Sequence, residues 1–456
     1  MPPRATTPVV REREDHSARI EAWVAVCGLI LLSLLPSFSK FSGIQPGGVP
    51  TGELQGTEEP AGSSVDQILW TLLYFAAVAR MFTLGDRTRR LFRHSIALIA
   101  FVLLTLLSTF WSVVPIVTLK ESIELIGTTM IGYYFVARFE LPKFLELLGI
   151  AFGALAVMSV VLIVVSPGLG LDAENGGDWS GVYAEKNGLG AAMALALITL
   201  IVVVMRTRGR RRLLFSSFLV LCAVLIIGSR SVTASAVLLA TLLVVFDVYL
   251  CQSKRFGAVT RLATVIIVVL VPLVLAVTGA GPDTFFTLVG KDSNLTGRTD
   301  FWPALVQAIG DRPWLGYGYN AFFAPDGAWH QYLGILVTYW QWQPFHAHES
   351  FLQVALDVGL IGATLLAIVL VLGFAKAAIY TARDRSAVNV WPLAIIALLT
   401  FGSFTETYLT MDNTIEWILF TTALLYPVRD SLRREAVPPS RSLRLSTRRR
   451  RDRPDV

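Results

Sequence analysis

Long uncharged runs of apolar residues recur along most of the chain. Three examples without any charged residue are Gly188–Met205, Leu213–Ser229 and Leu262–Gly281. A helix needs about 20 such residues to cross the ~30 Å hydrocarbon layer of a bilayer. Only structures that close their own backbone hydrogen bonds are stable there. The pattern therefore predicts a series of transmembrane α-helices.

We expect about twelve transmembrane helices. Their approximate positions are 20–38, 66–84, 95–113, 118–137, 144–166, 188–205, 213–229, 231–250, 262–281, 351–374, 389–407 and 413–427. The span at 118–137 is the least regular, because it carries Lys120, Glu121 and Glu124. The run at 20–38 follows a tail with both charge signs and no small-residue cleavage site, so we interpret it as a retained helix.

Composition supports a membrane protein. The chain has 456 residues, 54% of them hydrophobic and only 16% charged. Soluble globular proteins carry roughly 25% charged residues, so this chain has too few to cover a soluble core of its size.

Charge sets the orientation of the spans. When successive spans cross the membrane in alternating directions, all but seven of the 39 Lys and Arg residues fall on segments at the same membrane face. The excess of basic residues marks that face as cytoplasmic. We predict an all-α integral membrane protein with both termini in the cytoplasm and one long extracytoplasmic loop carrying short amphipathic helices. Residues 20–428 would form the membrane domain, with the loop at about 282–349. Residues 1–19 would be a disordered cytoplasmic tail and 429–456 a basic one.

The basic residues on the opposite side are the informative ones. They are Lys40, Lys120, Lys186, Arg230, Lys291, Arg298 and Arg312. A cation at a membrane boundary costs a few kcal/mol unless it has a partner or lies in a wet cavity. Together they could form a phosphate-binding funnel. Alternatively, each pairs with a local acid, such as Asp300 for Arg298 or Glu185 for Lys186.

The predicted outer loop has its own pattern. Five apolar residues fall on one helical stripe, which predicts an amphipathic helix at the membrane surface: Phe301, Trp302, Leu305, Val306 and Ile309. Gly316–Asn320 is predicted to be a turn. Five of the eleven Trp residues lie in this loop. Anchoring at the interface is the usual role of Trp there, and stacking on sugar rings is the alternative.

Three of the five histidines also lie in this loop: His330, His346 and His348. His348 lies at the mouth of a predicted helix whose interior carries Asp357, an intramembrane acid that should have a partner or a task. His346 and His348 could suggest a metal site. On a helix, however, residues at i and i+2 point apart, and no carboxylates of ligand spacing accompany them, so we expect no metal.

Four segments in this order match a known pattern. They are Gly181–Gly190, Ser229–Arg230, Gly297–Trp302 with Pro313–Gly318, and His348–Gly362. From about Trp111 to Tyr426 the chain resembles the O-antigen ligase and polysaccharide polymerase superfamily of bacterial inner membranes. Glu349 is a departure, since the family usually has Asn at that position.

The resemblance implies a metal-independent glycosyltransferase without a cofactor. It would move a glycan from an undecaprenyl-pyrophosphate carrier to an acceptor hydroxyl, on a glycan or glycolipid, outside the membrane. Arg230 and Arg298 would bind the pyrophosphate, and His348 would act on the acceptor hydroxyl. Six further residues are candidates for substrate binding: Lys186, Asn187, Trp302, Glu349, Asp357 and Glu406.

Several alternatives stay open. Ligase and polymerase differ in the acceptor, which nothing in the sequence identifies. A secondary transporter of a polar or anionic solute would also have about twelve helices, but we find neither internal repeats nor polar groups gathered at the bilayer midplane. The bilayer and the lipid-linked donor are the expected partners, and no nucleic acid is expected.

Overall fold

The computed structural model describes residues 8–34, 64–172, 176–251, 298–340, 345–383 and 386–436. Within these ranges the regular secondary structure is helical apart from one small antiparallel pair of strands, in which Leu171 pairs with Trp179 and Asp172 with Asp178. In chain order the elements are α1 (Pro8–Leu34), α2 (Ser64–Leu84), α3 (Asp86–Arg93), α4 (Ile96–Leu107), η2 (Ser108–Phe110), α5 (Pro115–Arg138), α6 (Leu141–Val165), α7 (Pro167–Gly170), β1 (Leu171–Asp172), β2 (Asp178–Trp179), α8 (Lys186–Arg206), α9 (Gly209–Gly228), α10 (Val232–Cys251), α14 (Arg298–Asp311), α15 (Trp329–Trp340), α16 (Ser350–Arg383), η4 (Ala387–Val390), α17 (Trp391–Gly402) and α18 (Ile415–Ala436).

Every predicted span except 262–281, which lies outside the described residues, coincides with a helix. Within the described part of the chain, five helices are long and apolar enough to cross a membrane. They are α2, α6, α8, α9 and α16, and α3 with α4 would make a sixth if that pair, bent by 83°, is one span. Apolar stretches in α1, α10 and α17 are shorter. The fold is thus that of an all-helical, multi-pass membrane protein.

Small and hydroxyl-bearing residues let the helices approach closely. A Cβ added to Gly132 of α5 would lie 2.6 Å from the Thr421 side chain of α18. In the same contact, the Trp417 indole Nε1–H donates to Thr129 Oγ1 at 2.8 Å. Close backbone approach of this kind is typical of helix pairs in membranes, because apolar side chains gain little from leaving lipid.

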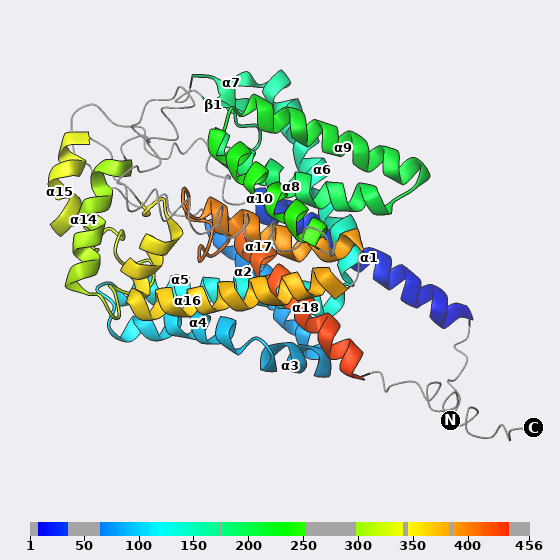
Figure 1. The fold of residues 1–456 in the computed structure, drawn as a ribbon, viewed down its shortest axis with the longest axis horizontal. Coiled ribbons are helices and arrows are strands. Elements are labelled where there is room, and N and C mark those ends of the chain that lie inside the picture. The colour runs from blue at the N-terminus through cyan, green and yellow to red at the C-terminus, as the bar shows by residue number, and fades with distance from the viewer. Residues whose placement is uncertain are drawn as a thin grey trace, which may run out of the picture.

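The two ends of the bundle differ in what they carry (Figure 1). Helices α14 and α15 lie at one end, together with α7 and the β1–β2 strands. At the opposite end lie the start of α1, the end of α18, helix α3 and the connection between α8 and α9. The basic residues of the predicted cytoplasmic side include Arg87–Arg90 on α3 and Arg206–Arg212 at the α8–α9 connection. The predicted inner and outer segments therefore lie at opposite ends.

The predicted loop packs around a small hydrophobic core of its own. Its fully buried members include Leu305 and Ala308 of α14, Phe322, Leu333 of α15, and Leu356 of α16. The helix predicted around 301–309 is α14, but its buried face differs from the predicted stripe, because Val306 is 58% exposed. The loop core therefore connects α14 and α15 to the start of α16.

Helix α16 is broken where it meets the loop. Val358 and Gly359 have non-helical backbone angles, with φ of +68° at Gly359. The freed backbone groups bond to the Pro313–Gly318 segment. Leu360 N–H donates to Pro313 O at 2.7 Å. In the other direction, Tyr317 N–H donates to Leu356 O at 2.7 Å, and Gly318 N–H donates to Asp357 O at 2.8 Å. Irregular backbone at membrane depth is stable when it is buried in protein in this way.

Candidate functional site

His348 lies directly before α16 and contacts a carboxylate from another part of the chain. Its Nδ1 is 3.5 Å from Glu406 Oε2, and the two side chains are only 12% and 10% exposed. Glu406 follows α17, and its backbone carbonyl accepts a hydrogen bond from Ser350 Oγ at 3.2 Å. Ser350 N–H donates to Ser403 O at 2.9 Å. These bonds fix the end of α17 against the start of α16, and so bring Glu406 beside the histidine.

The second histidine packs on the first. The rings of His346 and His348 have centroids 3.9 Å apart, and His348 N–H donates to His346 Nδ1 at 3.0 Å. Residues at i and i+2 point apart on a helix, but these two histidines do not lie on one, because both precede α16 and His348 has a φ of +51°. The expectation that their side chains diverge is therefore wrong. This backbone turn brings the two rings together.

Glu349, the departure from the family pattern, caps α16. Its Oε2 accepts the N–H of Leu352 at 2.5 Å, as a side-chain oxygen at a helix N-terminus commonly does. The residue is only 8% exposed. Burial raises the pKa of Glu349 to about 7, although the N–H groups of Leu352 and Phe351 favour the carboxylate. An ionisable group that titrates near neutrality therefore adjoins His348.

Trp302 and Asp357 support this loop. The Trp302 Nε1–H donates to the carbonyl of Ala347 at 3.0 Å, so its polar group is engaged by the segment that carries His348. Asp357 is 1% exposed. Its Oδ1 accepts hydrogen bonds from Gln353 Nε2 at 3.0 Å and from the N–H of Asn320 at 3.2 Å. Gln353 in turn accepts the Ala347 N–H at 2.8 Å. Trp302 therefore bonds directly to the segment before α16, and Asp357 is connected to that segment through Gln353.

A second group of charged residues lies at the junction of α9 and α10. Asp178 of β2 accepts from Lys186 Nζ through Oδ2 at 2.9 Å and from Arg230 Nη1 through Oδ1 at 3.4 Å. Lys186 thus pairs with Asp178, not with Glu185 as the local alternative supposed. Asn187 Oδ1 accepts from Ser231 Oγ at 3.0 Å. The Gly181–Gly190 and Ser229–Arg230 segments are therefore in contact.

Arg298 begins α14, but its side chain lies outside the described residues. Arg230 and His348 both lie on segments that connect helices toward the α14–α15 end of the bundle (Figure 1). The convergence of Arg230, Arg298 and His348 on one cavity stays a prediction.

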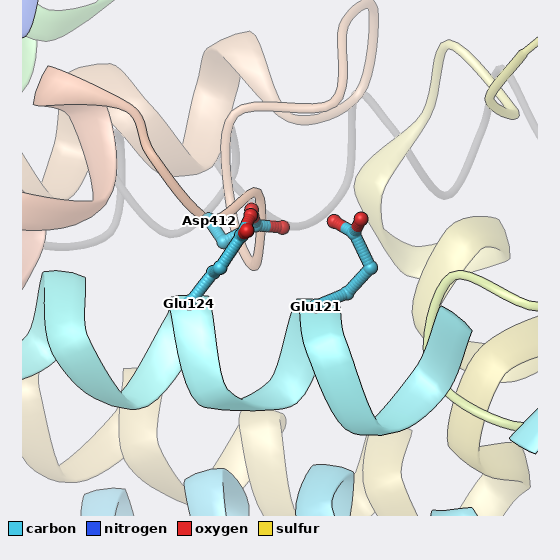
Figure 2. Close-up of side chains that lie close together, drawn as sticks. All are labelled: Glu121, Glu124 and Asp412. Atoms are coloured by element: carbon cyan, nitrogen blue, oxygen red, sulfur yellow. The ribbon is translucent and has the colours of Figure 1, made fainter. Parts of the chain in front are cut away.

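Three carboxylates form a further cluster. Oxygens of Glu121, Glu124 and Asp412 lie within 4.8 Å of one another, with the two Glu on one face of α5 and Asp412 opposite (Figure 2). Such a set could hold a hard cation. Protein groups already bond to it, including Asn413 Nδ2 to Glu124 at 2.8 Å and Lys120 Nζ to Glu121 at 3.0 Å. Burial, with the nearby Glu121 and Glu124, holds the pKa of Asp412 well above its usual range, which favours a shared proton.

Comparison with known proteins agrees with this architecture. The profile of a family described as O-antigen ligase matches residues 215–367, a range that contains Arg230, Arg298 and His348. This protein is a multi-pass membrane protein whose residues 215–367 are similar to the O-antigen ligase family, which confirms the resemblance predicted from the sequence. A curated relative is the exopolysaccharide production protein ExoQ of Rhizobium meliloti (strain 1021). It is 25% identical over 342 residues, which cover 71% of this chain and 75% of the relative.

Two acidic positions were missed in the sequence. Asp178 precedes Lys186 by eight residues, so a search for an acid near each outer cation finds it. Asp412 is far in the sequence from Glu121 and Glu124, and no local signal connects them. In the sequence, Glu121 and Glu124 stand out only as charges that make the 118–137 span irregular, and Asp412 is the partner they share in the structure.

Proposed function

We propose that this protein is a glycosyltransferase that moves a glycan from an undecaprenyl-pyrophosphate carrier to an acceptor hydroxyl. The observation that carries the proposal is the His348–Glu406 pair, held at 3.5 Å by two segments that are distant in sequence. The place of His348 within the matched O-antigen ligase region and the name of the curated relative, an exopolysaccharide production protein, support the assignment, although Glu406 itself lies beyond the matched residues.

The chemistry follows from the pair. In the tautomer whose Nδ1–H points at Glu406, His348 carries its lone pair on Nε2 and can accept the proton of an acceptor hydroxyl. Glu406 would hold the ring in that tautomer and stabilise the imidazolium that forms. The hydroxyl oxygen would then bond to the anomeric carbon as the bond from that carbon to the pyrophosphate oxygen breaks. Because pyrophosphate leaves as an anion, cations are needed at that end.

Arg230 suits the pyrophosphate role. Its side chain is 77% exposed although it contacts Asp178, so most of its guanidinium donors are accessible to a ligand. A guanidinium binds phosphate oxygens bidentately. We assign Arg298 to the same task because it lies in the matched family region. Lys186 adds a positive charge nearby, and no metal or cofactor is assigned.

The proposed setting is the bacterial inner membrane. About twelve spans with both termini in the cytoplasm would place the α14–α15 end outside. Cysteines introduced in 206–212 should resist an impermeant thiol reagent in intact cells, whereas cysteines in 302–312 should react. The reverse labelling pattern would contradict the orientation.

The transporter alternative gains no support from the break in α16. Broken helices in transporters expose backbone groups to a substrate or ion, whereas here Leu356, Asp357 and Leu360 bond to the Pro313–Gly318 segment. The deciding experiment supplies the purified protein in nanodiscs with lipid-linked saccharide extracted from cells that lack the gene. Release of undecaprenyl pyrophosphate together with a new glycosidic bond is expected. The proposal would be overturned if the purified protein released no carrier and cells lacking the gene still made the polysaccharide.

A further inference from the structure

Asp178 is the contact that Lys186 and Arg230 share. Each of its two oxygens accepts from one of them, Oδ2 from Lys186 at 2.9 Å and Oδ1 from Arg230 at 3.4 Å. The Asp178 side chain is 10% exposed and that of Lys186 15%, whereas that of Arg230 is 77% exposed. Asp178 and Lys186 are therefore the buried members of the group, and the Arg230 guanidinium is exposed to solvent.

The backbone around Asp178 is fixed on both sides. Asp178 pairs across the strands with Asp172, and Asp172 Oδ2 accepts the N–H of Lys186 at 3.0 Å. The next residue, Trp179, lies against the end of α9, since a Cβ added to Gly228 would lie 2.0 Å from its ring. The strand pair therefore packs against the α9–α10 connection that carries Arg230. This contact gives the Asp178 carboxylate a defined position relative to the arginine.

Arg230 itself has little freedom in its backbone. Its φ is +49°, a conformation that non-glycine residues seldom adopt, in the short connection between α9 and α10. Its long side chain has no such constraint and loses rotamer freedom when it is held. A single carboxylate contact at Nη1 restricts the guanidinium and leaves its other N–H donors available to a phosphate.

We propose that Asp178 is a positioning residue that holds Arg230, and with it Lys186, in the orientation that receives the pyrophosphate of the donor. The inference rests on the proposed function. Asp178 would not contact the donor, because a carboxylate repels a pyrophosphate. It also offsets one of the two positive charges of Lys186 and Arg230, so it would favour orientation of the cations over the strength of their attraction to the donor.

This balance gives a kinetic signature. Asp178→Asn keeps the size of the side chain but removes the negative charge and leaves one neutral oxygen acceptor, so it can no longer hold both cations. Donor binding should therefore stay within about fivefold of wild type or become tighter, while kcat should fall by about 100-fold, because a misplaced contact near the reacting atoms costs about that much. A purely structural role predicts a parallel loss of folded protein, binding and kcat.

The experiment uses the full chain in nanodiscs. Binding is measured with undecaprenyl pyrophosphate as the probe, and kcat is measured with lipid-linked saccharide extracted from cells lacking the gene. The variants are Asp178→Asn, Asp178→Glu, Arg230→Ala and the double variant Asp178→Asn/Arg230→Ala. Asp326→Asn is the matched control, since Asp326 is exposed and lies in the segment between α14 and α15.

The expected result is a kcat defect in Asp178→Asn with retained probe binding, and partial recovery in Asp178→Glu. Adding Asp178→Asn to Arg230→Ala should cost less than Asp178→Asn does alone, because only Lys186 then remains to be misplaced. Wild-type kcat in Asp178→Asn, or an additive loss in the double variant, would overturn the inference while leaving the proposed function intact. Failure of the wild-type protein both to bind the probe and to release carrier would instead remove the proposed function on which the inference rests.

Discussion

Gly359 lies against the backbone of Trp314: a Cβ added to Gly359 would be 2.2 Å from the Trp314 carbonyl carbon and oxygen. The contact joins the break in α16 to the segment that follows α14. In the segment that faces this break, a Cβ on Gly316 would lie 2.3 Å from the Leu356 carbonyl oxygen. Both glycines have positive φ, +68° and +66°. The two segments can therefore bond along their backbones only because neither carries a side chain at these positions.

This contact predicts a strong effect of Gly359→Ala. The added methyl meets backbone atoms that cannot rotate away, and alanine disfavours the positive φ. We expect destabilisation on the order of 2–4 kcal/mol, seen as a loss of monodisperse protein in detergent size-exclusion chromatography. Gly310→Ala is the control, because a Cβ there has nothing within 4 Å. Equal yields of monodisperse protein from the two variants would contradict the prediction, because they would show that the fold does not need the close contact between the α16 break and the loop.

His348 is predicted to be the essential histidine. His348→Ala should reduce carrier release by about 100-fold or more, the usual contribution of a general base, with normal membrane levels. Glu406→Gln, which keeps a hydrogen-bond acceptor but removes the charge that stabilises the imidazolium, should lower carrier release by about tenfold or more. His346→Ala and His330→Ala should be milder, and an inactive His346→Ala with an active His348→Ala would reverse the assignment within the pair.

The two arginines are predicted to require their planar guanidinium groups. Arg230→Lys and Arg298→Lys keep the charge but lose bidentate geometry, so each should lower kcat/KM for lipid-linked saccharide by about tenfold or more.

Chelation separates this mechanism from one that uses a metal at the Glu121, Glu124 and Asp412 cluster. We expect EDTA to leave carrier release unchanged and Glu121→Gln to be nearly neutral for it. Loss of activity with EDTA that Mg²⁺ or Mn²⁺ restores, and that Glu121→Gln abolishes, would assign the divalent ion to that cluster instead.

Glu349 predicts a pH dependence of stability. Its pKa in the folded protein is raised to about 7, so the folded state holds this proton more tightly than the unfolded chain does. The resulting stabilisation is fully present below the ordinary pKa of a glutamate and is lost as the pH rises through about 7. Glu349→Gln stays neutral and keeps an oxygen for the Leu352 N–H.

The variant should therefore gain stability over wild type as the pH rises from about 5 to about 8.5, by a difference on the order of 2 kcal/mol. Thermal unfolding midpoints in nanodiscs measure it. Glu435→Gln, at an exposed position near the end of α18, serves as the control. Parallel pH profiles for wild type and Glu349→Gln would mean that the carboxylate is hydrated in the folded protein.

The hydropathy pattern alone predicts the helical character and the approximate position of every predicted span in the described residues. Hydropathy is a local property, and the requirement to close backbone hydrogen bonds in lipid leaves few alternatives. It also placed His348 at the mouth of α16 and Arg230 in the short α9–α10 connection, because both follow from where an apolar run begins or ends. The predicted turn at Gly316–Asn320 was similarly local, and Gly316, Gly318 and Asn320 do have positive φ.

Which side chains meet depends on the packing of the folded chain. Glu406 reaches His348 because hydrogen bonds fix the end of α17 against the start of α16, and Asp178 reaches Arg230 because Trp179 seats the strand pair on the end of α9. The break in α16 depends in the same way on Pro313–Gly318, whose backbone bonds to the groups that the helix leaves open. Such contacts join residues that are distant in sequence, and their geometry depends on the packing of whole helices, which no local pattern of hydropathy or charge contains.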